Sequence, residues 1–336
     1  HIKKKTIIEL INTLYEDSYH RSSFRYLFGI NTALLSRRVT ETASKVGEHY
    51  ISTDKAGYRR MYKKAALGGL LIGFMATLKI LGKSLPLAPS AVAFLNSMIY
   101  GLGFVAIHII GGTVATKQPA MTAAAIASTI SEVKGRKAAQ FTKLTELVVD
   151  IMRTQFIAIM GNISIAMPIA LLISSMWLYG LGRPLTSEAS AEHLLHDLNP
   201  FTSLAIFHAA IAGVYLYISG LIAGYYDNLA VHNKIGERIR NHPTLKRMMT
   251  PVTLLRFSDF IERNLGAIMS NFLFGCFLGS TATIGYIFGL PLDIRHIAFA
   301  SANFIHGIFN IYANTGEFPE IGIILVSLFG VMVIGM

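Results

Sequence analysis

Three histidines, His108, His208 and His306, lie inside long apolar stretches of the sequence. Each falls in the second helix of a predicted helical hairpin. Imidazole carries protons near neutral pH, and polar groups within hydrocarbon are costly and often functional. If the hairpins pack around a common axis, the three rings would form a proton relay or a substrate site. The more common alternative is that each ring makes an interhelical hydrogen bond or lies at the level of the lipid headgroups.

Two asparagines occupy equivalent places in a repeated string. AIMGN ends at Asn162, and AIMSN ends at Asn271, 109 residues later. Asparagine inside a membrane helix commonly bonds to a neighbouring helix. We therefore favour a structural role for both side chains over a role in binding substrate.

Outside the apolar stretches, Glu48 and His49 form an adjacent acid–base pair. Such a pair can bind a metal or move protons. Neighbouring residues on a helix point about 100° apart, because one turn takes about 3.6 residues, so these two side chains do not converge unaided. A metal would need further ligands, such as His20 or His232. The sequence therefore predicts no metal site.

Lys117 and Asp227 are two further polar candidates, and they follow the second and fourth apolar stretches. Asp227 is expected to pair with a cytoplasmic arginine, which is usually a structural role. The single cysteine, Cys276, lies in an apolar run, which excludes a disulfide framework and a cysteine-based metal site. No catalytic residues and no cofactor are predicted.

The elements that must position these residues are transmembrane helices. The chain is 52% hydrophobic and 15% charged, and its charges are concentrated between apolar runs. About 20 apolar residues cross a bilayer, and such a run must be helical because hydrocarbon offers no partner for backbone polar groups. The candidate spans are 65–81, 89–113, 154–180, 200–226, 264–289, 294–312 and 319–336. The sixth contains polar residues and has a re-entrant alternative, and the end of the chain may cut the seventh.

The basic residues predict the orientation of these spans. Of the 30 lysines and arginines, 26 lie in residues 1–64, 114–153 and 227–263. By the positive-inside rule these segments are cytoplasmic, as is the N-terminus, and the acidic 187–199 connection is periplasmic. We expect a cytoplasmic basic helical segment at 1–64 and a transmembrane domain at 65–336. The net charge of +11 then reflects cytoplasmic loops and lipid headgroups.

Internal similarity suggests that the spans repeat. LPL occurs at 85–87 and again at 290–292. The two AIM strings are 109 residues apart, and the same distance separates the aromatic strings WLYGL at 177–181 and YIFGL at 286–290. The sequence predicts an all-α polytopic bundle of about six or seven spans in repeated helical hairpins. The hairpins are about 65–113, 154–226 and 264–313, followed by a final span at 319–336. Basic amphipathic cytoplasmic helices are expected at 121–133, 138–152, 234–240 and 254–263, either at the lipid interface or packed on one another.

Several strings together resemble a bacterial family of transmembrane proteins labelled site-specific recombinases. They are GEHYI at 47–51, YRRM at 58–61, ALGG at 66–69, ATKQPAMTA at 115–123, GYYDN at 224–228 and GLPLDIRH at 289–296. The TKQPAMT string is the most specific, and the resemblance covers residues from about 20 to the end. Members of the family are longer, so the chain is expected to be part of a larger protein.

The residues do not carry a recombinase active site. A tyrosine recombinase needs a tyrosine nucleophile, two arginines and a His/Lys acid–base set on a soluble domain. His20, Arg21, Arg25 and Tyr26 have suitable types but lie on one short basic helix. If the label is literal, strand exchange would depend on sequence outside this chain.

The leading hypothesis from the sequence is a non-enzymatic protein of the bacterial inner membrane that binds or transports a small solute or lipid. The alternative is a membrane scaffold that holds a protein or DNA partner through its basic cytoplasmic face. Membrane lipids and a protein partner or second copy are the expected partners. Nucleic acid is not expected to bind this segment itself.

Overall fold

The computed structural model describes residues 51–115, 126 and 138–335, and within these ranges it contains helices and no strands. The all-α prediction is confirmed. The helices are α3 (Lys55–Lys83), α4 (Pro89–Ile109), α6 (Ala138–Leu181), α7 (Glu188–His196), α8 (Ala205–His232), α9 (Ile235–Asn241), α10 (Pro243–Met248), α11 (Pro251–Phe288), α12 (Ile297–Thr315) and α13 (Ile321–Ile334).

Local signals in the sequence set the ends of these helices. The Asp54 carboxylate accepts a hydrogen bond of 2.7 Å from the Gly57 N–H, which caps the start of α3. Thr250 caps α11 in the same way, with Pro251 at the first helical position. Gly289 ends α11 with a φ of 65°, a left-handed conformation that glycine adopts without strain.

Five helices, α3, α4, α6, α8 and α11, are long and apolar enough to cross a membrane. They contain the first five predicted spans. The 38 residues of α11 extend about 57 Å at about 1.5 Å per residue, nearly twice the thickness of the hydrocarbon. The charged N-terminal part of α11, which holds Arg256, Asp259, Glu262 and Arg263, therefore continues beyond any single membrane crossing.

The other two predicted spans are helical but are not among these five. The shorter is α13, with 14 residues. The other, α12, lies along α7 with both ends against the α6–α8 connection. Near one end Asn314 donates to the Thr186 carbonyl (3.0 Å), and at the other Arg295 pairs with Asp197 (2.9 Å). The choice between a full crossing and a re-entrant helix for 294–312 stays a prediction.

The packing partners differ from the predicted hairpins. The closest pairs are α3 with α6 and α4 with α11, and α8 packs on α11. Within the described structure, the backbone of α6 does not pack closely against that of α8, nor that of α11 against α12, although side chains of all four helices belong to one hydrophobic core. The boundaries of the hairpins and the internal repeat remain predictions.

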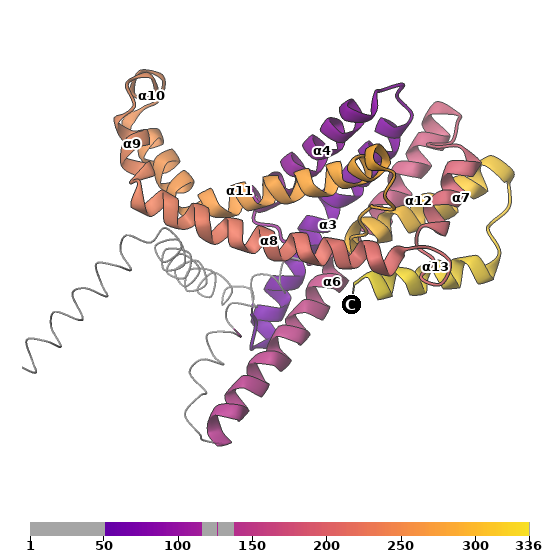
Figure 1. Ribbon diagram of the computed structural model, residues 1–336, viewed down its shortest axis with the longest axis horizontal. Coiled ribbons are helices and arrows are strands. Elements are labelled where there is room, and N and C mark those ends of the chain that lie inside the picture. The colour runs from indigo at the N-terminus through magenta and orange to yellow at the C-terminus, as the bar shows by residue number, and fades with distance from the viewer. Residues whose placement is uncertain (1–50, 116–125, 127–137, 336) are drawn as a thin grey trace, which may run out of the picture.

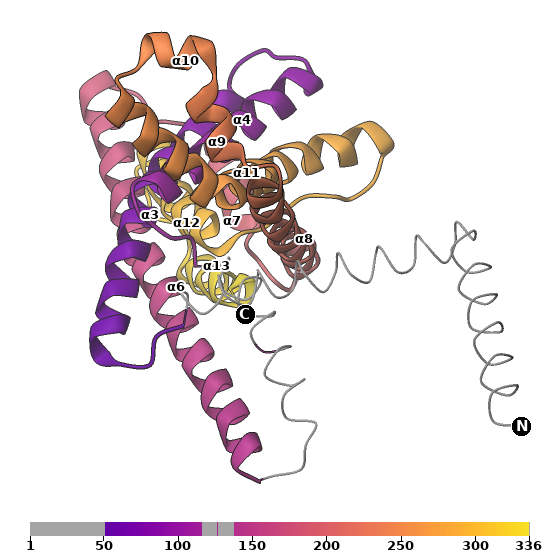
Figure 2. The same cartoon turned by 90° about the vertical axis from the view of Figure 1, so that its left-hand side faces the viewer.

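Three parts are visible in the fold. The α3–α6 pair runs diagonally across the view in Figure 1. Helices α7, α12 and α13 gather to the right of this pair, and α8 and α11 run together toward the left. The short helices α9 and α10 lie at the tip of this α8–α11 arm, and Figure 2 shows the same grouping after a quarter turn. The arm carries two of the predicted basic helical segments, 234–240 and 254–263, whereas 121–133 lies almost entirely outside the described residues.

Candidate functional site

His306 lies at the centre of a fully buried polar chain. Its side chain, on α12, has no exposed surface. The Nε2 atom lies 3.2 Å from the Thr77 hydroxyl on α3, and the Nδ1 atom lies 2.8 Å from the Ser174 hydroxyl on α6. Because both ring nitrogens have hydroxyl partners, either tautomer is satisfied, and the ring joins three helices.

One helical turn further along α12, Asn310 continues this chain. Its Oδ1 atom accepts hydrogen bonds from the backbone N–H groups of Leu185 (2.8 Å) and Thr186 (3.3 Å). Its Nδ2 atom donates to the His306 carbonyl at 2.8 Å and to the Ser174 hydroxyl at 3.5 Å. Polar contacts therefore run without a break from α3 to the connection between α6 and α7.

A pocket of about 470 Å³ lies directly against the end of this chain. It is formed by the C-terminal ends of α3 and α6 and by the start of α7, with Asn314 of α12. Its lining residues are Ile80, Leu81, Lys83, Ser84, Trp177, Arg183, Pro184, Leu185, Thr186, Ser187, Ser190, Leu194 and Asn314. Leu185 and Thr186, whose backbone N–H groups donate to Asn310, belong to this lining. The row of buried polar side chains therefore reaches the floor of the pocket.

The pocket lining contains two cations and no carboxylate. Lys83 and Arg183 are both exposed, and neither makes an ion pair with another described residue. Hydroxyl groups of Ser84, Thr186 and Ser190 line the same space. This arrangement suits a ligand with several oxygen acceptors.

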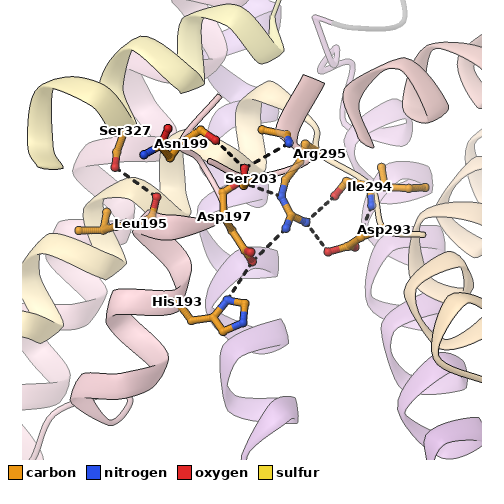
Figure 3. A network of polar contacts seen from close by, with 10 residues as sticks. His193, Leu195, Asp197, Asn199, Ser203, Asp293, Ile294, Arg295 and Ser327 are labelled. Atoms are coloured by element: carbon orange, nitrogen blue, oxygen red, sulfur yellow. Dashed lines mark hydrogen bonds and ion pairs between the residues drawn. The ribbon is translucent and has the colours of Figure 1, made fainter. Parts of the chain in front are cut away.

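Arg295 organises a separate cluster of charges at the entry to α12 (Figure 3). Its guanidinium pairs with Asp197 at 2.9 Å and with Asp293, and its side chain is only 12% exposed. Asp197 also lies 3.3 Å from the Nδ1 atom of His193. Burial raises the pKa of the Asp293 carboxyl, but the positive charges of Arg295 and Lys79 outweigh it and hold that pKa below its ordinary value.

This cluster holds the start of α12 against the end of α7, and its charges satisfy one another. We assign it a structural role because its arginine is already paired with two carboxylates. Sequence reasoning did not select Asp197, Asp293 or Arg295 as site residues. The available signal was the GLPLDIRH string at 289–296, which contains two of them.

The three predicted histidines have different surroundings. The Nε2 atom of His108, on α4, lies 3.0 Å from the Asn264 amide oxygen on α11. His208, on α8, has its Nε2 atom 3.1 Å from the Pro291 carbonyl, and its buried Nδ1 atom has no hydrogen-bond partner among the described residues. No hydrogen bond joins any two of these three rings. Of the three, only His306 is connected to the pocket lining, through Ser174 and Asn310.

The two asparagines of the repeat also differ. The Asn162 side chain bonds the Ala65 and Thr113 carbonyls and the Ala115 N–H, at 2.5, 3.1 and 2.7 Å, so it links three segments. Asn271 donates to the Ala267 carbonyl of its own helix at 2.8 Å.

The candidates that the sequence predicts to be cytoplasmic are only partly described. The Asp227 carboxylate accepts a hydrogen bond of 3.0 Å from the Gly266 N–H on α11, and it has no arginine partner among the described residues. Glu48, His49 and Lys117 lie outside the described residues. Across the described ranges, no three His, Cys, Asp or Glu side chains gather as a metal site.

Together, the five long apolar helices and the buried polar chain define a polytopic α-helical protein of the membrane-spanning class. The chain matches the family described as Site-specific recombinase over residues 1–336, and it belongs to that family. Searches of curated proteins and of solved structures found no match.

Proposed function

We propose that the protein binds a small solute or a lipid headgroup in the pocket between α3, α6 and α7 and moves it across or within the membrane. The observation that supports this most directly is the contact between the pocket floor and the buried chain of Asn310, Ser174, His306 and Thr77. Polar groups are costly at such depth, so a connected row of them beneath a pocket is better suited to a ligand or proton path than to packing alone.

The location that we propose is the inner membrane of a bacterium, with residues 1–64 in the cytoplasm. The support is the distribution of lysine and arginine, which by the positive-inside rule favours a periplasmic position for the pocket. Cysteine substitutions test this orientation. In intact spheroplasts, a membrane-impermeant maleimide should label Ser187→Cys and leave Met248→Cys unlabelled until the cells are lysed.

Transport is tested in proteoliposomes with a panel of solutes and fluorescent lipids. The Ser190→Trp variant fills the pocket and should abolish the flux that the unmodified protein supports. Gly213→Trp is the matched control, because position 213 lies outside the pocket lining and a Cβ added there meets nothing within 4 Å. Absence of flux and of bound ligand across the whole panel would contradict the proposal, as would equal losses in both variants.

A second candidate function is a scaffold that holds a protein or DNA partner through the α8–α11 arm. It is favoured by the tip of the arm, where Met248 is 76% exposed and Val252 is 61% exposed. The basic residues Lys246, Arg247 and Arg256 lie next to them in the sequence. An exposed surface that combines cations with apolar side chains suits an anionic partner.

DNA binding by the intact protein in nanodiscs separates this candidate from transport. If the arm binds DNA, affinity should fall steeply between about 50 and about 200 mM salt, and the slope should be shallower for K246Q/R247Q. Binding that does not depend on these two cations would exclude the arm as the DNA-binding surface.

A further inference from the structure

The pocket between α3, α6 and α7 has features that define the charge of its ligand. Lys83 is in the last turn of α3, where the helix dipole alone would favour a cation. Arg183 lies beyond the end of α6, after Gly182, whose φ of 65° turns the chain out of the helix. The dipole does not explain a cation at this second position, which is off the helix and lines the pocket.

The side chains around these two cations provide hydrogen-bond donors. Ser187 is the N-cap residue of α7, but its hydroxyl does not cap the helix and instead donates to the Ser190 hydroxyl at 3.2 Å. The first backbone N–H groups of α7 are therefore left without this side-chain acceptor. Thr186 and Asn314 add further polar groups to the same wall.

Aromatic residues place the pocket near the level of the lipid headgroups. Trp177, the only tryptophan in the chain, lines the pocket, and Tyr179 two residues later is 80% exposed. Tryptophan and tyrosine are enriched at the interface between membrane and water. Ile80, Leu81 and Leu194 give the pocket an apolar side next to its polar one.

We propose that this pocket binds a phosphate group, carried either by a phospholipid headgroup or by a small phosphorylated solute. This inference rests on the proposed function and names the chemical class of its ligand. A phosphate presents more acceptor oxygens than a carboxylate, and it carries one or two negative charges. Two cations, several hydroxyls and the open start of a helix match that pattern better than they match a neutral solute.

The experiment uses the intact protein in neutral detergent and measures retention of lipid by native mass spectrometry. The two lipid probes are phosphatidylglycerol and a diacylglycerol with the same acyl chains, which lacks the phosphate. The protein should retain phosphatidylglycerol at least about tenfold better than diacylglycerol, and K83Q/R183Q should lose most of this preference.

The matched control is K246Q/R247Q, which removes two positive charges at the tip of the arm, far from the pocket in sequence and outside its lining. This control should keep the preference for phosphatidylglycerol. Circular dichroism and gel filtration confirm that both variants fold. Equal losses in the two variants would show that retention follows net charge alone and would overturn the inference.

A second measurement distinguishes the two sources of phosphate, a lipid headgroup and a soluble solute. Glycerol 3-phosphate and inorganic phosphate are titrated against the detergent-solubilised protein, with sodium chloride at equal ionic strength as the reference. Thermal stabilisation by the free phosphates, lost in K83Q/R183Q, assigns the pocket to a soluble ligand, whereas an effect of phosphatidylglycerol alone assigns it to lipid. If no phosphate probe binds but a neutral solute is transported, the inference fails and the proposed function stands.

Discussion

Two closely packed helix crossings, α3 on α6 and α4 on α11, hold the bundle together in different ways. Glycine permits close approach in both. A Cβ added to Gly69 on α3 would lie 2.4 Å from the Asn162 carbonyl oxygen, and a Cβ added to Gly275 on α11 would lie 2.2 Å from the Gly101 nitrogen. In each case the obstacle is the backbone of the partner helix, so the helices themselves would have to separate.

The difference lies in the asparagines. At the α3–α6 crossing, Asn162 bonds three backbone groups, because the 113–115 segment passes beside it. At the α4–α11 crossing, Asn271 bonds only its own helix. Similar strings of sequence therefore give Asn162 interhelical partners and Asn271 a partner within its own helix. At the second crossing other residues join α4 to α11: His108 lies 3.0 Å from the Asn264 amide oxygen, and the Ser97 hydroxyl donates to the Cys276 carbonyl at 3.3 Å.

The largest expected effect comes from Asn162→Ala. It removes the partner of two buried carbonyls and one buried N–H, each costing about 1 kcal/mol, so the free energy of unfolding should fall by about 3 kcal/mol. Titration of the micelle-bound protein with sodium dodecyl sulfate measures this change. A loss below about 1 kcal/mol would mean that water or lipid replaces these bonds.

The next largest effect is expected at the other crossing. Gly275→Ala introduces a methyl group against the backbone of α4, and overpacking of this kind costs about 2 kcal/mol. The same titration measures it. Gly213→Ala serves as the control, since its methyl group meets nothing within 4 Å and no loss is expected. Equal stability of the two variants would show that the crossing is looser than the structure indicates.

A smaller effect is expected from Thr77→Val, which tests the hydrogen bonds that join α3 and α6 to His306. Valine keeps the shape of threonine but leaves the His306 Nε2 atom without its hydroxyl partner, at a cost of about 1 kcal/mol. Unfolding curves of Thr77→Val and Thr77→Ser are compared, and serine should restore most of the loss. If serine is no better than valine, the hydroxyl does not bond to His306.

The smallest effect is expected from Asn271→Ala. Only one hydrogen bond within α11 is lost, so stability should change by less than about 0.5 kcal/mol. Measured beside Asn162→Ala, this variant directly compares the two asparagines. A loss as large as that of Asn162→Ala would show that Asn271 has interhelical partners too.

Much of the fold could be predicted from the sequence because the membrane limits the choices. Long apolar runs predicted the five helices that are able to span. The segments 254–263 and 264–289 were expected as separate elements, whereas α11 runs through both without a break. The prediction was weakest at 294–312, where polar residues shorten the apolar run. There the sequence left two alternatives open, and the structure shows this segment as a helix packed against α6 and α7.

The candidate site could be predicted only in part. His306 was selected because a histidine inside an apolar run is unusual, but the matching argument for His108 and His208 gave no sign that they lie in different surroundings. Lys83 and Arg183 are ordinary residues at the ends of spans when seen in the sequence. They line one pocket only because α3 packs on α6, while the α6–α7 connection and the start of α7 supply the rest of the lining.

The sequence by itself determined that the chain forms apolar helices with cationic connections, because burial of backbone polar groups in hydrocarbon is a local requirement that each run must meet alone. Tertiary structure decided which polar side chains meet. Thr77 and His306 are 229 positions apart in the chain, and a hydrogen bond between them depends on helix positions defined to within a few tenths of an ångström. No local pattern of residues specifies distances of that kind.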